Sequence, residues 1–167
     1  MSICTHHATL LPLAARELET HLRVRRNAVN ALVSLDGEDR WGYPGPERLD
    51  QMAEESAARR EQIRVAERAL EHMVLSLRES DPTALEAWIT AQELLLDTYL
   101  HELAQHPEPD RVTTEVFVAQ GERNSWNRVR AGDLTFVDQN SFYVRPPREL
   151  YLHLFGVEPW HDVSSAP

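Results

Sequence analysis

Lysine is absent from this chain, and all 17 of its basic residues are arginine. Several kinds of enzyme depend on the amine of a lysine side chain. The sequence therefore excludes a Walker A phosphate-binding loop, Schiff-base catalysis on the chain, a lysine general base and a protein-kinase core.

Glycine and cysteine are also scarce. The six glycines never fall into a GxGxxG or GxSxG pattern, which excludes a dinucleotide-binding turn and the nucleophile elbow of the serine hydrolases. The one cysteine, Cys4, excludes a disulfide framework and a cysteine-rich zinc site.

Long apolar runs and a basic leader are missing as well. No stretch approaches the ~20 apolar residues of a membrane span, so we expect no membrane association. The first residues lack the basic region of a secretory signal, and a single cysteine suits a reducing compartment. We therefore expect a cytoplasmic protein.

The residues that are present describe a folded, acidic chain. With 167 residues, 42% of them hydrophobic, it is long enough to bury one core. Its net charge of −10 disfavours nucleic acid as a partner and permits a basic protein.

Apolar residues spaced three and four apart predict three long helices that pack as an antiparallel bundle. Pro46 is well placed as the first residue of the second helix, and Asp81 and Pro82 separate the second from the third. The expected ranges are about Thr9–Leu35, Pro46–Arg78 and Thr83–Gln105.

After Asp110 the apolar period changes to two, as in a β-strand. Val112, Val116 and Val118 alternate with polar residues, and segments 134–137 and 142–144 flank a turn. This pattern predicts a small antiparallel β-meander with a hairpin. Pro147 and Gly156 then bracket a short helix, Arg148–Phe155.

The expected fold class is thus mainly α with a small β part (α+β). We expect a single domain, 1–167. Its expected parts are a flexible N-terminus (1–8), a three-helix bundle (9–106), the β-meander (111–146), a short helix (147–156) and a tail (157–167).

Matching levels along antiparallel helices predicts a polar layer inside the bundle. The layer is either a salt bridge that fixes helix register or a pocket for an anion or small ligand. In the second case Glu102, His101 and His21 are the candidate catalytic groups. The candidate ligand-binding residues are Arg25, Arg59, Ser56 and Tyr99.

The second and third helices carry charge stripes of opposite sign. Arginines at 60, 64 and 68 are predicted to face Glu93 and Asp97 in an interhelical ladder. The alternative takes Glu93, Asp97 and His101 as metal ligands. Because the facing stripe is cationic, we expect no metal there. No other cofactor is expected.

Segment 123–130 is expected to be a loop of the meander. It mixes one aromatic residue with arginines, as in surfaces that bind nucleic acid: Arg123, Trp126, Arg128 and Arg130. The alternative is a loop whose tryptophan packs on the bundle and whose arginines pair with surface acids.

Three functions stay open. The sequence favours a non-enzymatic protein-protein interaction module that binds a basic partner, such as an adaptor, an antitoxin or immunity-type protein, or a chaperone. The alternatives are a small helical-bundle enzyme or ligand binder that uses the polar layer, and a nucleic-acid or nucleotide binder. The apolar helix 148–155 also leaves homodimerisation open.

Overall fold

The computed structural model describes residues 10–40, 42, 45–133 and 145–159. Five α-helices and one short 3-10 helix make up most of this part, and no β-strand occurs in it. In chain order they are α1 (Leu13–Arg40), α2 (Pro46–Ser80), α3 (Pro82–Ala104), η1 (Pro109–Val112), α4 (Thr113–Arg130) and α5 (Arg148–Phe155).

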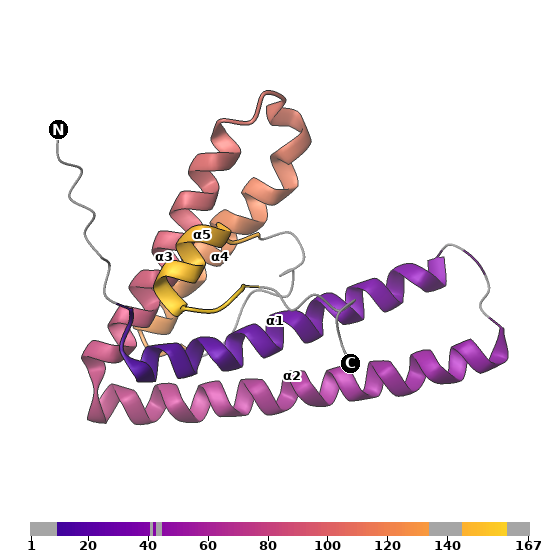
Figure 1. Ribbon diagram of the computed structural model, residues 1–167, viewed down its shortest axis with the longest axis horizontal. Coiled ribbons are helices and arrows are strands. Elements are labelled where there is room, and N and C mark those ends of the chain that lie inside the picture. The colour runs from indigo at the N-terminus through magenta and orange to yellow at the C-terminus, as the bar shows by residue number, and fades with distance from the viewer. Residues whose placement is uncertain (1–9, 41, 43–44, 134–144, 160–167) are drawn as a thin grey trace.

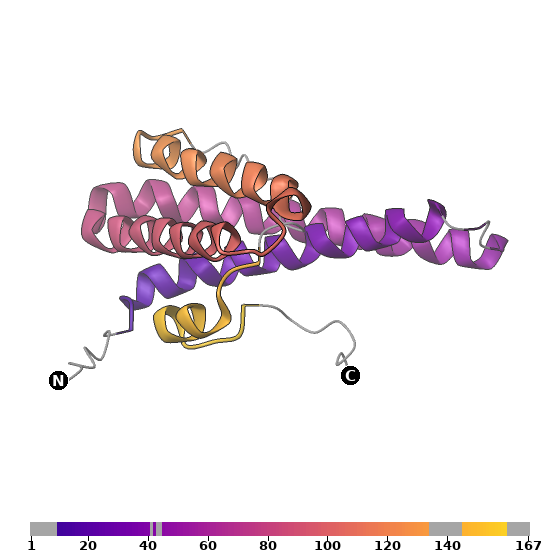
Figure 2. The ribbon, with the colours of Figure 1, turned by 90° about the horizontal axis from the view of Figure 1, so that it is seen from above.

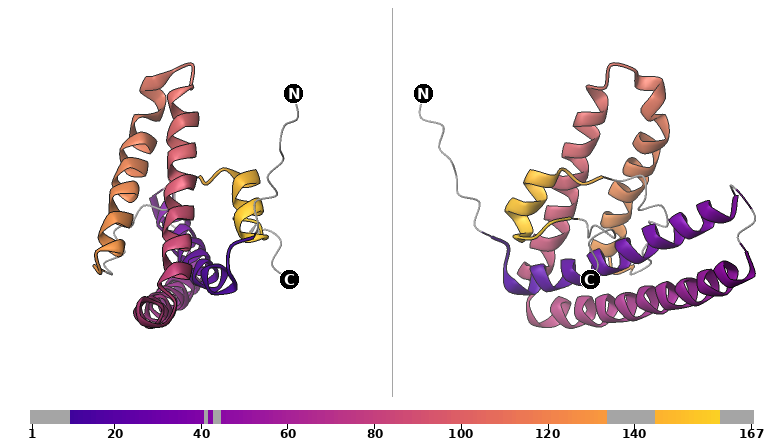
Figure 3. Two further views of the ribbon diagram at one scale, coloured as in Figure 1. Left: turned by 90° about the vertical axis from the view of Figure 1, so that its left-hand side faces the viewer. Right: turned by 45° about the vertical axis from the view of Figure 1, so that its right-hand side comes forward.

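The helices form two antiparallel hairpins that cross. Helices α1 and α2 make a long hairpin, and α3 rises steeply from the end of α2 before α4 returns beside it (Figure 1). Seen from above, α3 lies between α4 on one side and α5 on the other (Figure 2). The three long helices are therefore not aligned as one bundle, because α3 leaves α2 at an angle and pairs with α4 (Figure 3).

The hydrophobic core lies where the two hairpins cross. Helix α1 contributes Leu18 and Leu22, and α2 contributes Leu70 and Val74. Trp88 of α3 meets Trp126 of α4 edge to face, with ring centroids 4.9 Å apart. This geometry suits the charge distribution of two aromatic rings.

The long hairpin extends well beyond that core. We call residues 30–64 the arm: the distal part of α1, the connection, and the first part of α2 (Figures 1 and 2). The buried residues of α2, Ala66, Leu70 and Val74, all follow the arm. Within the arm, Leu35 of α1 is buried at 9% exposure, whereas Leu32, Leu49, Met52 and Ile63 are only half-buried.

Several predicted boundaries are confirmed. Helix α2 starts at Pro46, and α5 spans Arg148–Phe155 and ends at Gly156 in the left-handed conformation, with φ of 75°. The Asp81 side chain caps α3 by accepting a hydrogen bond from the Ala84 amide at 3.1 Å.

The predicted β-meander is wrong. Residues of its first strand, including Val116 and Val118, belong to helix α4. The residues of α4 that pack inward are Ala119, Glu122, Trp126 and Val129, spaced three and four apart. Because a glutamate occupies one of these positions, the helical period is not visible in the apolar residues alone.

The first helix also runs past its predicted end at Leu35, through Asp36 and Gly37 to Arg40. A glycine inside a helix costs about 1 kcal/mol, which is too little to end one that is already propagating. The predicted flexible N-terminus (1–8), the hairpin segments 134–137 and 142–144, and the end of the predicted tail (160–167) lie outside the described residues.

Candidate functional site

A buried carboxylate, Glu19 of α1, holds helices α1, α3 and α5 together. It is 1% exposed. One oxygen, Oε1, accepts hydrogen bonds from the Tyr151 hydroxyl at 2.7 Å and from Arg26 Nη1 at 3.3 Å. The other, Oε2, accepts from Trp88 Nε1 at 3.0 Å and from Gln92 Nε2 at 2.5 Å. Four donors from three helices thus satisfy one carboxylate.

Arg26 extends this arrangement to α4. Its side chain is 8% exposed, and Nη2 donates to Glu122 Oε1 at 2.8 Å and to Gln92 Oε1 at 3.4 Å. We call Glu19, Arg26, Trp88, Gln92, Glu122 and Tyr151 the Glu19 network. A buried charge is tolerated only when it is paired and hydrogen-bonded. Arg26 pairs with both carboxylates, and Glu19 is hydrogen-bonded at both of its oxygens, so the network links four helices.

The Tyr151 hydroxyl stays protonated because of where it lies. Burial raises the pKa of Tyr151 above its ordinary value, and the negative charge of Glu19 raises it further. The neutral hydroxyl can therefore act as the hydrogen-bond donor that Glu19 requires.

A second buried charge, Arg25, lies beside the network on α1. It is 2% exposed, and its Nε donates to Glu67 Oε1 of α2 at 2.9 Å. This pair joins the two long helices near the point where the arm begins.

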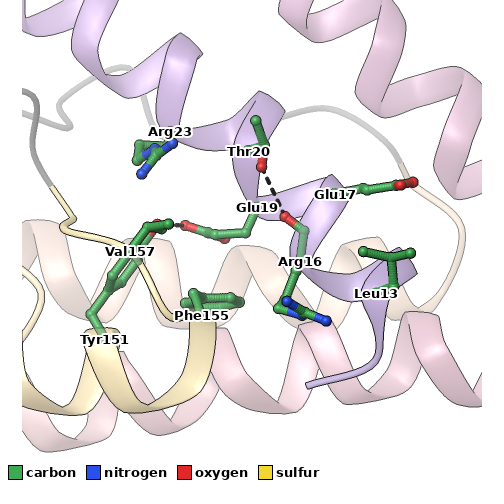
Figure 4. A pocket seen from close by; sticks show the side chains of 9 residues that line it. All are labelled: Leu13, Arg16, Glu17, Glu19, Thr20, Arg23, Tyr151, Phe155 and Val157. Atoms are coloured by element: carbon green, nitrogen blue, oxygen red, sulfur yellow. Dashed lines mark hydrogen bonds between the residues drawn. The ribbon is translucent and has the colours of Figure 1, made fainter. Parts of the chain in front are cut away.

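A pocket of about 200 Å³ opens between α1 and α5, next to the network. We call it the α1–α5 pocket. Figure 4 shows Arg16 and Arg23 on either side of Glu19, whose carboxylate points to the Tyr151 hydroxyl. The full lining is Leu13, Arg16, Glu17, Glu19, Thr20, Arg23, Tyr151, Phe155 and Val157.

Polar contacts of the flanking chain fix α5 over α1. Arg23 Nη1 donates to the Glu158 carbonyl at 3.1 Å. The Leu11 amide donates to the Leu154 carbonyl of α5 at 3.3 Å, and Arg16 Nε donates to the Leu11 carbonyl at 3.0 Å. Arg148 pairs with Glu158 across the two ends of α5, and this arginine lowers the pKa of the Glu158 carboxyl.

The structure disperses the residues of the predicted polar layer. Arg25 pairs with Glu67, whereas Arg59 donates to Gln62 of its own helix at 3.0 Å. Glu102 and His101 belong to the far end of α3, which rises away from α1 and α2 (Figure 1). The predicted layer matched residues across helices that run side by side. Because α3 crosses α2 instead, these residues do not meet.

The other residues of that layer also separate. Ser56 is half-buried in the arm, and Tyr99 is buried on α3, where burial raises the pKa of its hydroxyl. His21 lines a small cavity of about 220 Å³ between α1 and α2, together with Glu61 and Val65.

The acids of the predicted ladder face α4 rather than α2. Asp97 accepts from Arg123 Nε at 2.8 Å, and Glu93 pairs with both Arg123 and Arg130. On α2, Arg64 pairs with Glu61 of its own helix. Arg60 and Arg68 are exposed, and neither forms an ion pair with a described residue.

The same contacts argue against Glu93, Asp97 and His101 as metal ligands. Two arginines already neutralise the carboxylates, and His101 is exposed. Among the described residues, no group of three or more histidine, cysteine, aspartate or glutamate side chains is arranged to hold a metal ion.

Segment 123–130, expected as a loop, lies within α4. Trp126 is 4% exposed and packs on Trp88, so its ring faces the core. Arg123 and Arg130 pair with acids of α3, and Arg128 donates to the Ser125 hydroxyl at 3.4 Å.

Sequence reasoning missed the Glu19 network, although α1 carried a signal of it. Glu19, Leu22, Arg26 and Val29 repeat at three and four residues beside the apolar positions that predicted the helix. Two opposite charges two turns apart on an inward face indicate a buried pair. The partners of Glu19 and Arg26 on α3, α4 and α5 are brought together by tertiary structure, and no periodic pattern in the sequence identifies them.

In the described part of the chain, no helix is both long enough and apolar enough to span a membrane. No protein-family model, curated protein or solved structure matches this chain.

Proposed function

We propose that this protein is a non-enzymatic protein-protein interaction module that binds a basic partner through the arm. The observation that carries the proposal is the arm itself. Its two helices leave the core as a pair with no third element against them in the described structure (Figure 1). The polar groups that could otherwise serve chemistry, above all Glu19 and Arg26, are engaged in holding the core together.

The apolar residues of the arm support this proposal. Leu49, Met52 and Ile63 of α2 are half-buried, whereas Leu70 and Val74, nearer the core, are fully buried. Two helices alone leave most of the apolar surface between them open, because each helix covers only one side of the other. Of the described apolar residues in the arm, Leu35 alone is buried. A third helix from a partner would complete the burial.

Charge supports a basic partner. We call residues 36–55 the tip of the arm, and they carry seven acidic residues and two arginines. The resulting net charge of −5 is half of the −10 of the whole chain. A concentrated charge of one sign attracts an oppositely charged protein and accelerates its association.

The position of these acids also argues against a purely structural role. Asp36, Glu38 and Asp39 fall at the C-terminal end of α1, where the helix dipole is negative. Acids there destabilise the helix, and Gly37 adds to the cost. A cationic partner would relieve this repulsion.

A second copy of this chain could also cover the open apolar surface between the two helices of the arm. Two tips of the same negative charge would repel each other if they met side by side. Charge therefore favours a different, basic protein over a homodimer formed through the tip.

The single cysteine suits a reducing compartment, so we propose that the protein meets this partner in the cytoplasm.

The test is affinity capture from the native cells with three matched forms of the full chain. The first is wild type. The second is the tip variant D50N/E54Q/E55Q. The control, E71Q/E79Q/E149Q, removes the same charge from exposed positions away from the tip.

We expect a basic protein that binds wild type and the control, is lost from the tip variant, and dissociates as salt concentration rises. A protein retained equally by the tip variant would contradict the proposal. Light scattering on each purified form separates a heteromeric complex from a dimer of this chain.

A further inference from the structure

The α1–α5 pocket combines apolar walls with two cationic side chains, and this combination is independent of the arm. Its volume is about 200 Å³. An apolar cavity of about 150 Å³ accepts benzene, so the space suits a ring or a short branched chain. Leu13, Phe155 and Val157 supply apolar surface for such a group.

The two cations of the pocket have unused hydrogen-bonding capacity. Arg16 and Arg23 lie two helical turns apart on α1 and flank the pocket (Figure 4). Each uses one N–H group to bond a backbone carbonyl, whereas a guanidinium has five. Within the described part of the chain, neither arginine has a carboxylate at ion-pair distance.

Glu19, the carboxylate at the floor of the pocket, forms no described hydrogen bond or ion pair with either arginine. Glu19 accepts from four donors, and the one cationic donor, Arg26, also pairs with Glu122 at 2.8 Å. The four lone-pair positions of Glu19 are thereby occupied. The positive charge of Arg16 and Arg23 is therefore directed toward the space between α1 and α5.

We propose that the α1–α5 pocket binds a small organic carboxylate. Arg16 and Arg23 hold the carboxylate, because a planar guanidinium matches its two oxygens. The apolar body of the ligand lies against Phe155 and Val157. Because α5 forms one wall, the bound ligand also joins α5 to α1.

Glu17 lines the same pocket and supplies a built-in control. It is exposed, and it forms no ion pair with a described residue. Its negative charge at the mouth opposes an entering anion. Neutralising Glu17 should tighten binding of a carboxylate, whereas neutralising either arginine should weaken it.

The experiment is titration calorimetry of the full chain with benzoate, with methyl and aromatic NMR shifts of Val157 and Phe155 reporting the location. We expect a Kd on the order of 1 mM for wild type. R16Q and R23Q should each weaken binding about tenfold, and E17Q should tighten it about twofold. The exposed R68Q on α2, with the same charge change, should bind as wild type does.

Thermal melts verify that the variants fold. E17Q tests the site at an exposed residue whose replacement should not affect folding. Three results would each overturn the proposal: no benzoate binding at about ten times the expected Kd, affinity unchanged in both arginine variants, or equal affinity for the neutral benzyl alcohol. Inorganic phosphate binding as tightly as benzoate would overturn the organic carboxylate as the ligand class.

Discussion

Among single residues, Glu19 contributes most to fixing how the helices pack. A carboxylate with 1% exposure would be very costly alone, yet here Tyr151, Trp88, Gln92 and Arg26 satisfy both of its oxygens. Because the donors come from different helices, the network also disfavours any packing that separates them. Its role is therefore to define one arrangement of the helices.

Replacement of Glu19 by alanine should lower the free energy of unfolding by about 3–5 kcal/mol, because the buried donors of Trp88, Gln92 and Tyr151 would lose their acceptor. Arg26 would keep its ion pair with Glu122. Urea denaturation followed by circular dichroism measures the change. Glu54→Ala, at an exposed position of the arm, should stay within about 0.5 kcal/mol of wild type. A loss below about 1 kcal/mol for Glu19→Ala would contradict a central role for this carboxylate.

Tyr151 predicts a dependence of stability on alkaline pH. Burial and Glu19 raise the pKa of Tyr151 in the folded protein above the ordinary value of 10.0. The contribution of the neutral Tyr151 to the free energy of unfolding is fully present below pH ~10. It is lost as pH rises, because only the unfolded chain then ionises this tyrosine. The loss approaches about 1.4 kcal/mol per pH unit.

Comparison of wild type with Tyr151→Phe isolates this contribution from that of Tyr99, whose pKa is also raised by burial. Urea denaturation between about pH 8 and pH 11 provides the measurement. The stability difference between the two proteins should shrink as pH rises above about 10. A difference that stays constant over this range would mean that Tyr151 ionises equally well in both states.

At the scale of elements, the sequence predicts helices where their ends carry strong signals. Pro46, Asp81 and Gly156 mark boundaries through their own backbone and capping chemistry, and those boundaries are confirmed. Helix α4 lacks such signals. Its valines favour a strand, and the buried Glu122 breaks the apolar period that would have indicated a helix.

Two glycines should respond in opposite directions to substitution by alanine. Gly121 lies inside α4 with open space around an added methyl group, so Gly121→Ala should stabilise the protein by about 0.5–1 kcal/mol. Gly156 ends α5 at a φ of 75°, and Gly156→Ala should cost about 1–2 kcal/mol. Thermal and urea denaturation measure both, and a destabilising Gly121→Ala would count against α4 as described.

At the scale of the whole molecule, the crossing of two hairpins places the core at one end and leaves the arm at the other (Figure 1). The sequence could not predict this arrangement, because helix periodicity indicates which face is buried and not which helix covers it. The same limit explains the candidate sites. Glu93 is in an ion pair whose partner lies on α4 and depends on the crossing. Arg25 pairs with Glu67 inside the long hairpin, where the predicted polar layer had placed other residues beside it.

The arm should open more readily than the core. Amide groups in residues 46–60 belong to a two-helix region without a buried side chain on α2, whereas residues 66–74 pack into the core. Local opening costs less free energy where fewer apolar groups are buried. Hydrogen exchange followed by mass spectrometry should show faster exchange in 46–60 than in 66–74, and equal rates would contradict the description of the arm.

The most direct test of the arm as the functional surface is hydrogen exchange of the full chain with and without the captured partner. We expect amides of residues 46–55 to become protected in the complex, while those of α4, residues 113–130, exchange as before. Protection confined to α3 and α4, with unchanged exchange in residues 46–55, would contradict this expectation and move the interaction surface to the second hairpin.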